Sequence, residues 1–178
     1  QQQLFIKAVK SQITDTTNSM LSSETINALR VLINTKEGDL ALIAELFKLP
    51  SFDTLAAEFE VIPVDEIIEI TEKFEQQIAD ELADELLACY ESLEDDGSVR
   101  ASSVAKRALK QTCLHYLAKT QKPEAVSFIK EAANSTNMTN VLGALSAVVK
   151  ASHPIQEELL SHFDSQWRHD VLVMDNAY

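Results

Sequence analysis

The chain has 178 residues with only three Gly and four Pro, and 46% of its residues are hydrophobic and 24% charged. This composition is typical of a folded domain rather than a disordered segment, and the scarcity of Gly and Pro argues against a turn-rich β architecture. The formal net charge of −13 repels phosphate backbones, so we expect no nucleic-acid partner, and no apolar run approaches the roughly 18 residues of a membrane span.

The N-terminal third predicts four short helices separated by polar breaks. We place them at residues 1–13, 22–34, 39–49 and 51–59. Ser22 or Ser23 and Asp39 are the expected N-caps of the second and third helices, because their short side chains accept hydrogen bonds from the first backbone N–H groups of a helix, and Ser51 starts the fourth.

The longest stretch of helical spacing runs from Pro63 to Leu93. Its apolar residues follow one another at steps of three or four, and they are Ile67, Ile70, Phe74, Ile78, Leu82, Leu86 and Tyr90. This spacing predicts one continuous helix, roughly 40 Å long at about 1.5 Å per residue, with a buried stripe. Such a helix must pack its stripe against neighbouring helices, so we expect the rest of the chain to be organised around it.

The excess of negative charge lies on the opposite side of this helix and on its flanks. Residues 53–96 contain 16 acids and one base, a net charge of −15, which leaves +2 for the remainder. Pairs at i, i+4, such as Asp80 with Asp84 and Glu81 with Glu85, suit weak cation binding or acid–base work. Because no other residues predict a concave site around them, we interpret them as a solvated face.

A basic helix follows the loop Glu94-Asp95-Asp96-Gly97. We place it at residues 101–119, with Lys106, Arg107 and Lys110 along its polar side. The residues expected to face inward are Val104, Ala108, Leu109, Thr112, Cys113, Tyr116 and Leu117. Acidic and basic helices that are adjacent in sequence predict an antiparallel hairpin with complementary surfaces.

Three more helices are predicted at residues 123–133, 138–152 (with Asn137 as the N-cap) and 154–167. In the second of these, Gly143, Ala147 and Ala151 share a face with little side-chain bulk, so a neighbouring helix can approach closely. The chain therefore predicts an all-α fold of about eight or nine helices. Short polar loops and the lack of a fixed sequence period indicate an irregular array of antiparallel helical hairpins, an α-superhelix.

No arrangement of residues predicts a reaction centre. The four histidines are His115, His153, His162 and His169, and no HExxH motif or His pair at i, i+4 with a nearby acid completes a zinc site. Cys89 and Cys113 have no metal-binding spacing, so we interpret them as free thiols. We expect no catalytic, cofactor-binding or metal-ligating residue in this chain.

Several segments together resemble a known domain. They are ALRVLIN (28–34), LALIAELFKLPS (40–51), ELADELLACY (81–90), AKRALKQTCLHYLA (105–118), NMTNVLGALSAVV (137–149) and LVMDNAY (172–178). In order and spacing they resemble the C-terminal helical domain of the bacterial alanyl aminopeptidases, or aminopeptidases N, of the M1 zinc metallopeptidase family. The resemblance covers residues 23–178, with 1–22 a weakly matched lead-in, so 1–178 is expected to be a single helical segment of a larger C-terminal domain.

This resemblance implies a parent that is a multidomain cytoplasmic enzyme, which removes N-terminal residues from peptides. Its zinc is held by an HExxH helix and a downstream Glu, and neither is in this sequence, so no zinc ligand carries over. The family's C-terminal domain closes over the active site and limits entry to peptides. The implied partners are the catalytic and other domains of the parent and its peptide substrates.

The chain starts with Gln1 rather than Met and finishes on an apolar stretch without a cap, which we interpret as a piece of something longer. The alternative is a free-standing acidic helical module that docks a basic partner protein.

Overall fold

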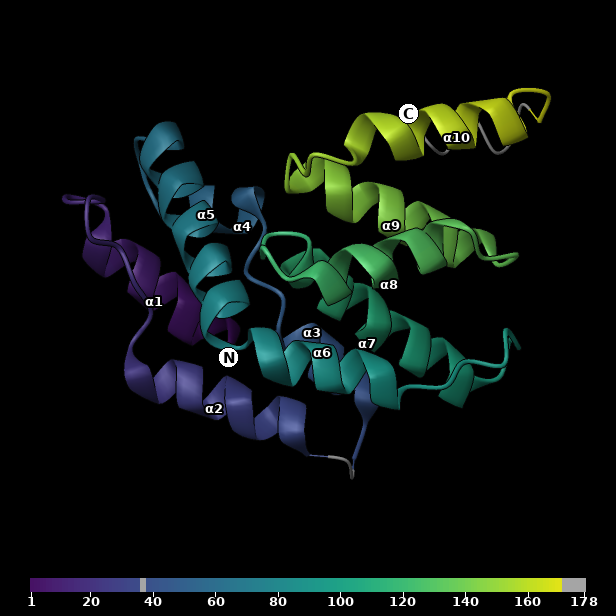
Figure 1. Cartoon of the computed structure of the whole chain (residues 1–178). Helices are drawn as coiled ribbons and strands as arrows, with labels where there is room; N and C mark the ends of the chain where they lie inside the picture. The colour runs from purple at the N-terminus through teal and green to yellow at the C-terminus, as the bar shows by residue number, and fades with distance from the viewer. Residues whose placement is uncertain (36–37, 171–178) are drawn as a thin grey trace.

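The computed structural model describes residues 1–35 and 38–170, which form ten α-helices and no β-strand (Figure 1). The helices are α1 Gln2–Gln12, α2 Ser23–Asn34, α3 Leu40–Leu46, α4 Phe52–Ala56, α5 Val64–Glu81, α6 Ala83–Ser92, α7 Ala101–Leu117, α8 Pro123–Ala133, α9 Met138–Lys150 and α10 Gln156–Trp167. The all-α prediction is therefore confirmed for the described part of the chain. The predicted apolar C-terminal stretch lies outside the described residues.

Local sequence signals determine where five of the ten described helices begin. Ser22, Asp39, Ser51 and Asn137 are N-caps whose side chains accept hydrogen bonds from backbone N–H groups two or three residues further on. Pro123 occupies the first turn of α8, where its missing N–H costs no hydrogen bond. The capping predictions for α2 and α3 are thus confirmed, and the cap of α4 is Ser51, the residue predicted to start that helix.

The single helix predicted from Pro63 to Leu93 is wrong, because the chain bends at Leu82. This residue has φ −113° and ψ 15°, which separates α5 from α6. All seven predicted stripe residues are nevertheless buried. The stripe has different partners along its length: α5 packs against α1, α4 and α7, whereas α6 packs against α2 and α7. A bend lets both halves bury their apolar side, and it raises the helix count above the predicted eight or nine.

Helix α7 lies at the centre of the molecule and packs against α3, α5, α6, α8 and α9. The last four helices stack one above another in Figure 1, in the manner of a helical repeat array. The predicted packing between the acidic and basic helices is confirmed for α6 and α7. Two side-chain predictions on α7 are wrong: Arg107 is 7% exposed rather than solvated, and Val104 is 49% exposed rather than buried.

The close approach predicted for α9 is confirmed, and its neighbour is α7. A Cβ atom added to Gly143 would lie 2.9 Å from Cγ of Gln111, so only a residue without a side chain fits there undisturbed. The Gln111 amide then donates a hydrogen bond of 3.0 Å to the Thr139 carbonyl oxygen. This contact fixes the distance between the two helices at one end of their interface.

The acidic side of α5 and the start of α6 is exposed, as predicted, apart from Glu85, which is half-buried. Glu85 pairs with Arg30 of α2 at 3.0 Å, and Asp84 pairs with Lys122 at 3.0 Å. Most of the negative charge therefore lies at the surface of the N-terminal half. Within the described ranges, the helices are all too short or too polar to cross a membrane.

Candidate functional site

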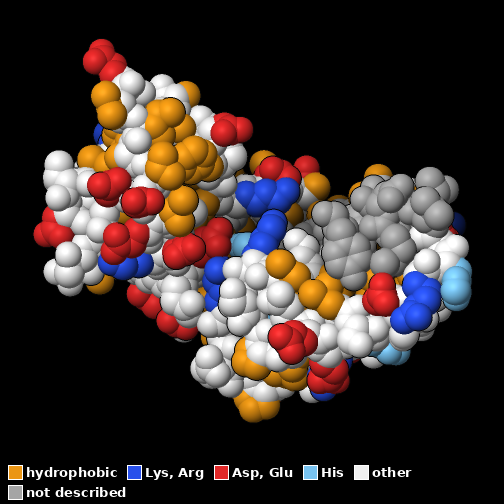
Figure 2. Space-filling view, turned by 90° about the horizontal axis from the view of Figure 1, so that it is seen from above, with side chains coloured by type: hydrophobic (Ala, Val, Ile, Leu, Met, Phe, Trp, Pro, Cys, Tyr) orange, Lys and Arg blue, Asp and Glu red, His pale blue; other side chains and the backbone are white. Residues whose placement is uncertain are grey.

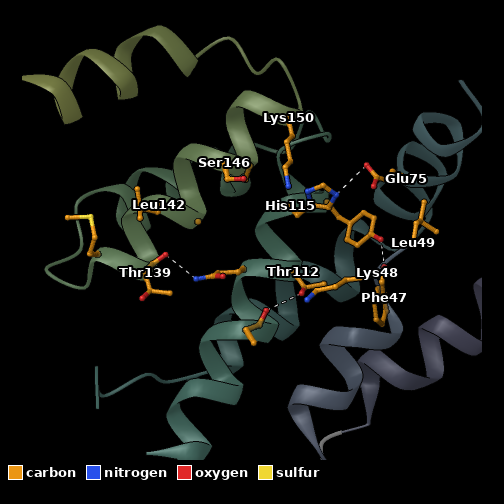
Figure 3. A pocket seen from close by; sticks show the side chains of 16 residues that line it. Phe47, Lys48, Leu49, Glu75, Thr112, His115, Thr139, Leu142, Ser146 and Lys150 are labelled. Atoms are coloured by element: carbon orange, nitrogen blue, oxygen red, sulfur yellow. Dashed lines mark hydrogen bonds and ion pairs between the residues drawn. The ribbon is translucent and has the colours of Figure 1, made fainter. Parts of the chain in front are cut away.

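A pocket of about 680 Å³ lies between the end of α3, α5, α7 and α9 (Figure 3). It exists because the facing sides of α7 and α9 carry small residues, Ala108 on α7 and Gly143 and Ala147 on α9. Apolar walls come from Phe47, Leu49, Met138 and Leu142. The volume is in the range of about 300–1,000 Å³ that small-molecule sites in proteins occupy.

The wall between α3 and α7 is held by Tyr116. Its hydroxyl donates a hydrogen bond to the Phe47 carbonyl oxygen, and the two rings meet edge to face with centroids 6.3 Å apart. Burial, together with the nearby charge of Glu75, raises the pKa of Tyr116 above its ordinary value. The phenol therefore stays protonated and remains a donor at physiological pH, which makes it a structural residue of the pocket.

Charged groups from α5 and α7 meet at one side of the pocket. Oε2 of Glu75 lies 3.3 Å from Nε2 of His115 and 3.4 Å from Nζ of Lys119, and we call these three residues the Glu75 cluster. Burial alone raises the pKa of Glu75. The hydrogen bond from His115, with the charges of His115 and Lys119, outweighs burial and holds the pKa below its usual value. Glu75 is thus an ionised carboxylate that already has two partners, the His115 imidazole and the Lys119 ammonium group.

Two lysines complete the charged lining. Lys48 pairs with Glu45 at 2.6 Å, in a contact where both side chains are more than half exposed. Lys150, in the last turn of α9, makes no ion pair with any residue that the structure describes. Its side chain points toward His115 in Figure 3. In the space-filling view of Figure 2, Lys or Arg side chains gather near the middle of the face beside a pale blue His. The pocket lining is therefore cationic although the chain is acidic.

A second polar cluster lies toward the other end of α7, between this helix and the loop before it. Arg107 Nη1 pairs with Asp95 Oδ1 at 2.8 Å, and Arg107 Nη2 donates to the Ser98 carbonyl oxygen at 2.7 Å. The Ser103 hydroxyl donates to Asp96 Oδ1 at 2.6 Å. We call these five residues the loop cluster. The hydrogen bonds from Ser103 and Ser98 lower the pKa of Asp96 to about 2.

The family follows from a match over nearly the whole length. Residues 1–177 match the family described as "Domain of unknown function (DUF3458_C) ARM repeats". The chain belongs to the DUF3458_C family. The family match starts at residue 1, so it also includes residues 1–22, which resembled the aminopeptidase domain only weakly in the sequence analysis.

The relatives of this DUF3458_C domain are aminopeptidases. Aminopeptidase N of Escherichia coli (strain K12) is 37% identical over 154 residues, which are 85% of this chain and 18% of that protein. Aminopeptidase N of Haemophilus influenzae is 34% identical over 159 residues, 89% of this chain and 18% of that protein. The chain thus spans about a fifth of the length of these curated relatives. The resemblance to the C-terminal domain of bacterial aminopeptidase N is confirmed.

A solved structure shows the same fold. It is the crystal structure of Legionella pneumophila aminopeptidase A in complex with aspartic acid, with a TM-score of 0.81 and 19% sequence identity. The match covers 99% of this chain and 22% of that protein. At this identity the likeness concerns the fold alone, which is the helical repeat array of the DUF3458_C family.

The residues that the sequence singled out do not converge in the DUF3458_C domain. His153 accepts a hydrogen bond on Nδ1 from the Ile155 backbone N–H, and burial lowers its pKa. His162 and His169 do not line the pocket. In residues 1–35 and 38–170, no three His, Cys, Asp or Glu side chains gather to hold a metal ion. The expectation that this chain has no metal-ligating residue stays a prediction.

The two cysteines are free thiols, as the spacing predicts. Cys89 of α6 is half-buried and Cys113 of α7 is fully buried. A hydrogen bond from Cys113 lowers the pKa of Cys89, and the same bond with burial raises the pKa of Cys113. They are part of the packed α6–α7 contact rather than of the pocket.

Sequence reasoning missed the pocket and the Glu75 cluster. Lys150 is separated by 35 residues from His115, and His115 by 40 from Glu75, so no local motif joins them. One signal was available: His115 and Lys119 are four apart and share a side of the basic helix that faces an acidic one. That spacing indicates a shared acidic partner, although it does not identify Glu75.

The chemistry of the Glu75 cluster is limited to charge and proton exchange. Glu75 orients His115, but in the part of the chain that the structure describes no Ser, Thr or Cys side chain is hydrogen bonded to that ring. Thr112, almost one turn before His115 on α7, donates to the carbonyl oxygen of Ala108 in its own helix. The cluster therefore lacks the nucleophile–base contact of covalent catalysis.

Proposed function

We propose that this DUF3458_C domain is a non-catalytic C-terminal helical segment of a zinc-dependent aminopeptidase, whose role is to enclose the active-site cavity and limit substrate access. The parent cleaves N-terminal residues from peptides in the cytoplasm, and its zinc is held outside this chain. The observation that carries the proposal is the 37% identity to a protein named aminopeptidase N, of which this chain covers 18%.

The physical character of the domain supports a wall rather than a reaction centre. Its core is a packed series of helices. Within each polar cluster, the charged and polar side chains are paired with one another by ion pairs and hydrogen bonds. Exposed apolar side chains occur on α4, on α5 and in the segment between them, and they are Phe52, Val61, Ile62, Val64 and Ile68. Exposed apolar surface of this kind marks an interaction site, and the remaining domains of the parent are the partner proposed here.

The first experiment tests whether the chemistry lies elsewhere. The purified 178-residue chain and the full-length parent are assayed side by side for hydrolysis of alanyl-p-nitroanilide and for zinc content by elemental analysis. We expect turnover and one zinc in the parent, and neither in the isolated chain. Zinc-dependent turnover by the isolated chain would overturn the proposal.

The second experiment tests the enclosing role. The parent with residues 1–178 deleted is compared with the intact parent on alanyl-p-nitroanilide and on a folded protein that begins with Ala, with zinc content and circular dichroism as folding controls. We expect the intact parent to spare the folded protein and the deleted form to attack it. If a folded, zinc-loaded deletion variant still spares the folded protein, the domain does not limit access.

A further inference from the structure

We propose that the pocket between α3, α5, α7 and α9 binds a small organic carboxylate with an apolar body. This site goes beyond the proposed function and does not depend on it. The inference rests on three features of the pocket: its volume, its charge and its apolar walls.

The volume is available because the helices around it cannot close. Gly143 already meets the Gln111 side chain, with only 2.9 Å from its notional Cβ to Gln111 Cγ, so α9 cannot move closer to α7 at that point. On the other side, the Tyr116 hydroxyl fixes the end of α3 through the Phe47 carbonyl. The resulting space of about 680 Å³ is held open by contacts on both sides rather than by chance packing.

The charge of the lining selects an anion. Among the described residues that line the pocket, Glu75 is the sole acid, and it already pairs with Lys119 at 3.4 Å and contacts His115 at 3.3 Å. Lys150 has no acidic partner within the described residues, and it points toward His115 across the mouth of the pocket (Figure 3). Lys48 lies on the opposite wall and has only the solvent-exposed Glu45 as a partner. An incoming carboxylate would give the unpaired Lys150 its counter-charge.

The apolar walls of the pocket favour an anion that carries an apolar organic group. Leu49, Met138 and Leu142 line the pocket beside the lysines, and Thr139 and Ser146 add polar groups at its edge. An inorganic anion would leave these apolar side chains against water. A branched apolar group next to the carboxylate would cover them and remove their apolar surface from water, which favours binding.

The test uses two probes of equal size that differ in charge. N-acetyl-leucine carries a carboxylate, and N-acetyl-leucinamide is its neutral counterpart. Each is titrated into the ¹⁵N-labelled 178-residue chain and followed through the backbone amides of α7 and α9. We expect saturable shifts with N-acetyl-leucine and at least tenfold weaker binding of the amide. Equal binding of the two probes would overturn the proposal.

Matched variants test whether Lys150 is the cationic group that binds the carboxylate. Lys150→Gln removes the unpaired lysine, and Lys7→Gln removes an exposed lysine of α1 that likewise has no ion pair among the described residues. We expect at least fivefold weaker binding for Lys150→Gln and no change for Lys7→Gln. Ser146→Phe, which adds bulk at an exposed lining position, is expected to abolish binding while circular dichroism stays unchanged. Unchanged binding in both pocket variants would contradict the site.

Two further arms exclude other occupants. Inorganic phosphate is titrated in place of the probes, and affinity equal to that of N-acetyl-leucine would show only a cationic patch and overturn the proposal. The N-acetyl-leucine titration is then repeated on the full-length parent. Retained binding supports a small-molecule site, whereas loss of binding there means that another segment of the parent fills the pocket, and the proposal fails.

Discussion

The two polar clusters on α7 differ in what surrounds them. In the loop cluster, Arg107 and Asp95 expose 9% and 6% of their side chains, and every charge meets a partner within 12 residues along the chain. In the Glu75 cluster, Glu75 of α5 and His115 of α7 are 40 residues apart in the sequence, and His115 exposes 27% of its side chain beside an open pocket. An enclosed cluster serves the fold, whereas a cluster beside unfilled space is available to a ligand.

The largest effect is expected from breaking the enclosed ion pair. Arg107→Met leaves Asp95 buried without its cationic partner, so the free energy of unfolding should fall by about 3–5 kcal/mol. Urea unfolding at pH 7, followed by far-UV circular dichroism, measures this. Lys106→Met, the neighbouring residue on α7 with no ion pair in the described ranges, is the control and should change stability by less than about 0.5 kcal/mol. Equal losses in the two variants would contradict the enclosed role of Arg107.

A second test measures how the contribution of Asp96 in the loop cluster to stability depends on pH. The pKa of Asp96 is depressed to about 2, so its contribution to stability is present above the ordinary pKa of an Asp and is lost as the pH falls toward 2. Asp96→Asn should therefore be less stable than the wild type at pH 7, and the difference should disappear between about pH 4 and pH 2. Urea midpoints across this range give the measurement, with Asp53→Asn as the exposed control. A difference that persists at pH 2 would show that the charge of Asp96 is not the cause.

The Glu75 cluster should contribute less to the free energy of unfolding than the ion pair of the loop cluster. Glu75→Gln removes the charge shared by His115 and Lys119, and we expect a loss of about 1 kcal/mol at pH 7, because the groups remain partly hydrated. Since the folded pKa of Glu75 is lowered, this loss should shrink as the pH falls below its ordinary value. Glu72→Gln on the exposed side of α5 is the control in the same urea assay. A cost as large as that of Arg107→Met would erase the distinction between the clusters.

The smallest effect is expected at Gly143. Replacement by Ala gains about 1 kcal/mol of helix propensity, but it displaces the Gln111 side chain and its hydrogen bond to Thr139, which is worth about the same. The net change in unfolding free energy should therefore be near zero. In a Gln111→Ala background the displaced side chain is absent, so Gly143→Ala should become stabilising by about 1 kcal/mol. If Gly143→Ala destabilises equally in both backgrounds, Gln111 is not the group that resists it.

The features that the sequence predicted correctly are local. Ser22 and Asp39 cap helices through neighbours two or three residues away, and the stripe from Ile67 to Tyr90 is buried because its spacing alone defines one side of a helix. Pattern reasoning needs no knowledge of the partner in such cases.

The features that the sequence did not predict depend on which helices meet. Arg107 is a basic residue at a helical position that looks solvated, and it becomes buried only because the loop 93–100 folds back over it. The pocket needs Gly143 of α9 to pack beside Gln111 of α7, and the bend at Leu82 needs two different sets of partners. None of these contacts has a signature within a single segment.

The bend at Leu82 also decouples the two halves of the apolar stripe. In an unbroken helix, inserting or deleting one residue rotates everything beyond it by about 100° and turns the downstream stripe toward solvent. With a non-helical residue between α5 and α6, each half keeps its own phase toward its own partners. A homologous chain could therefore gain or lose a residue at this joint, yet keep both buried sides in place.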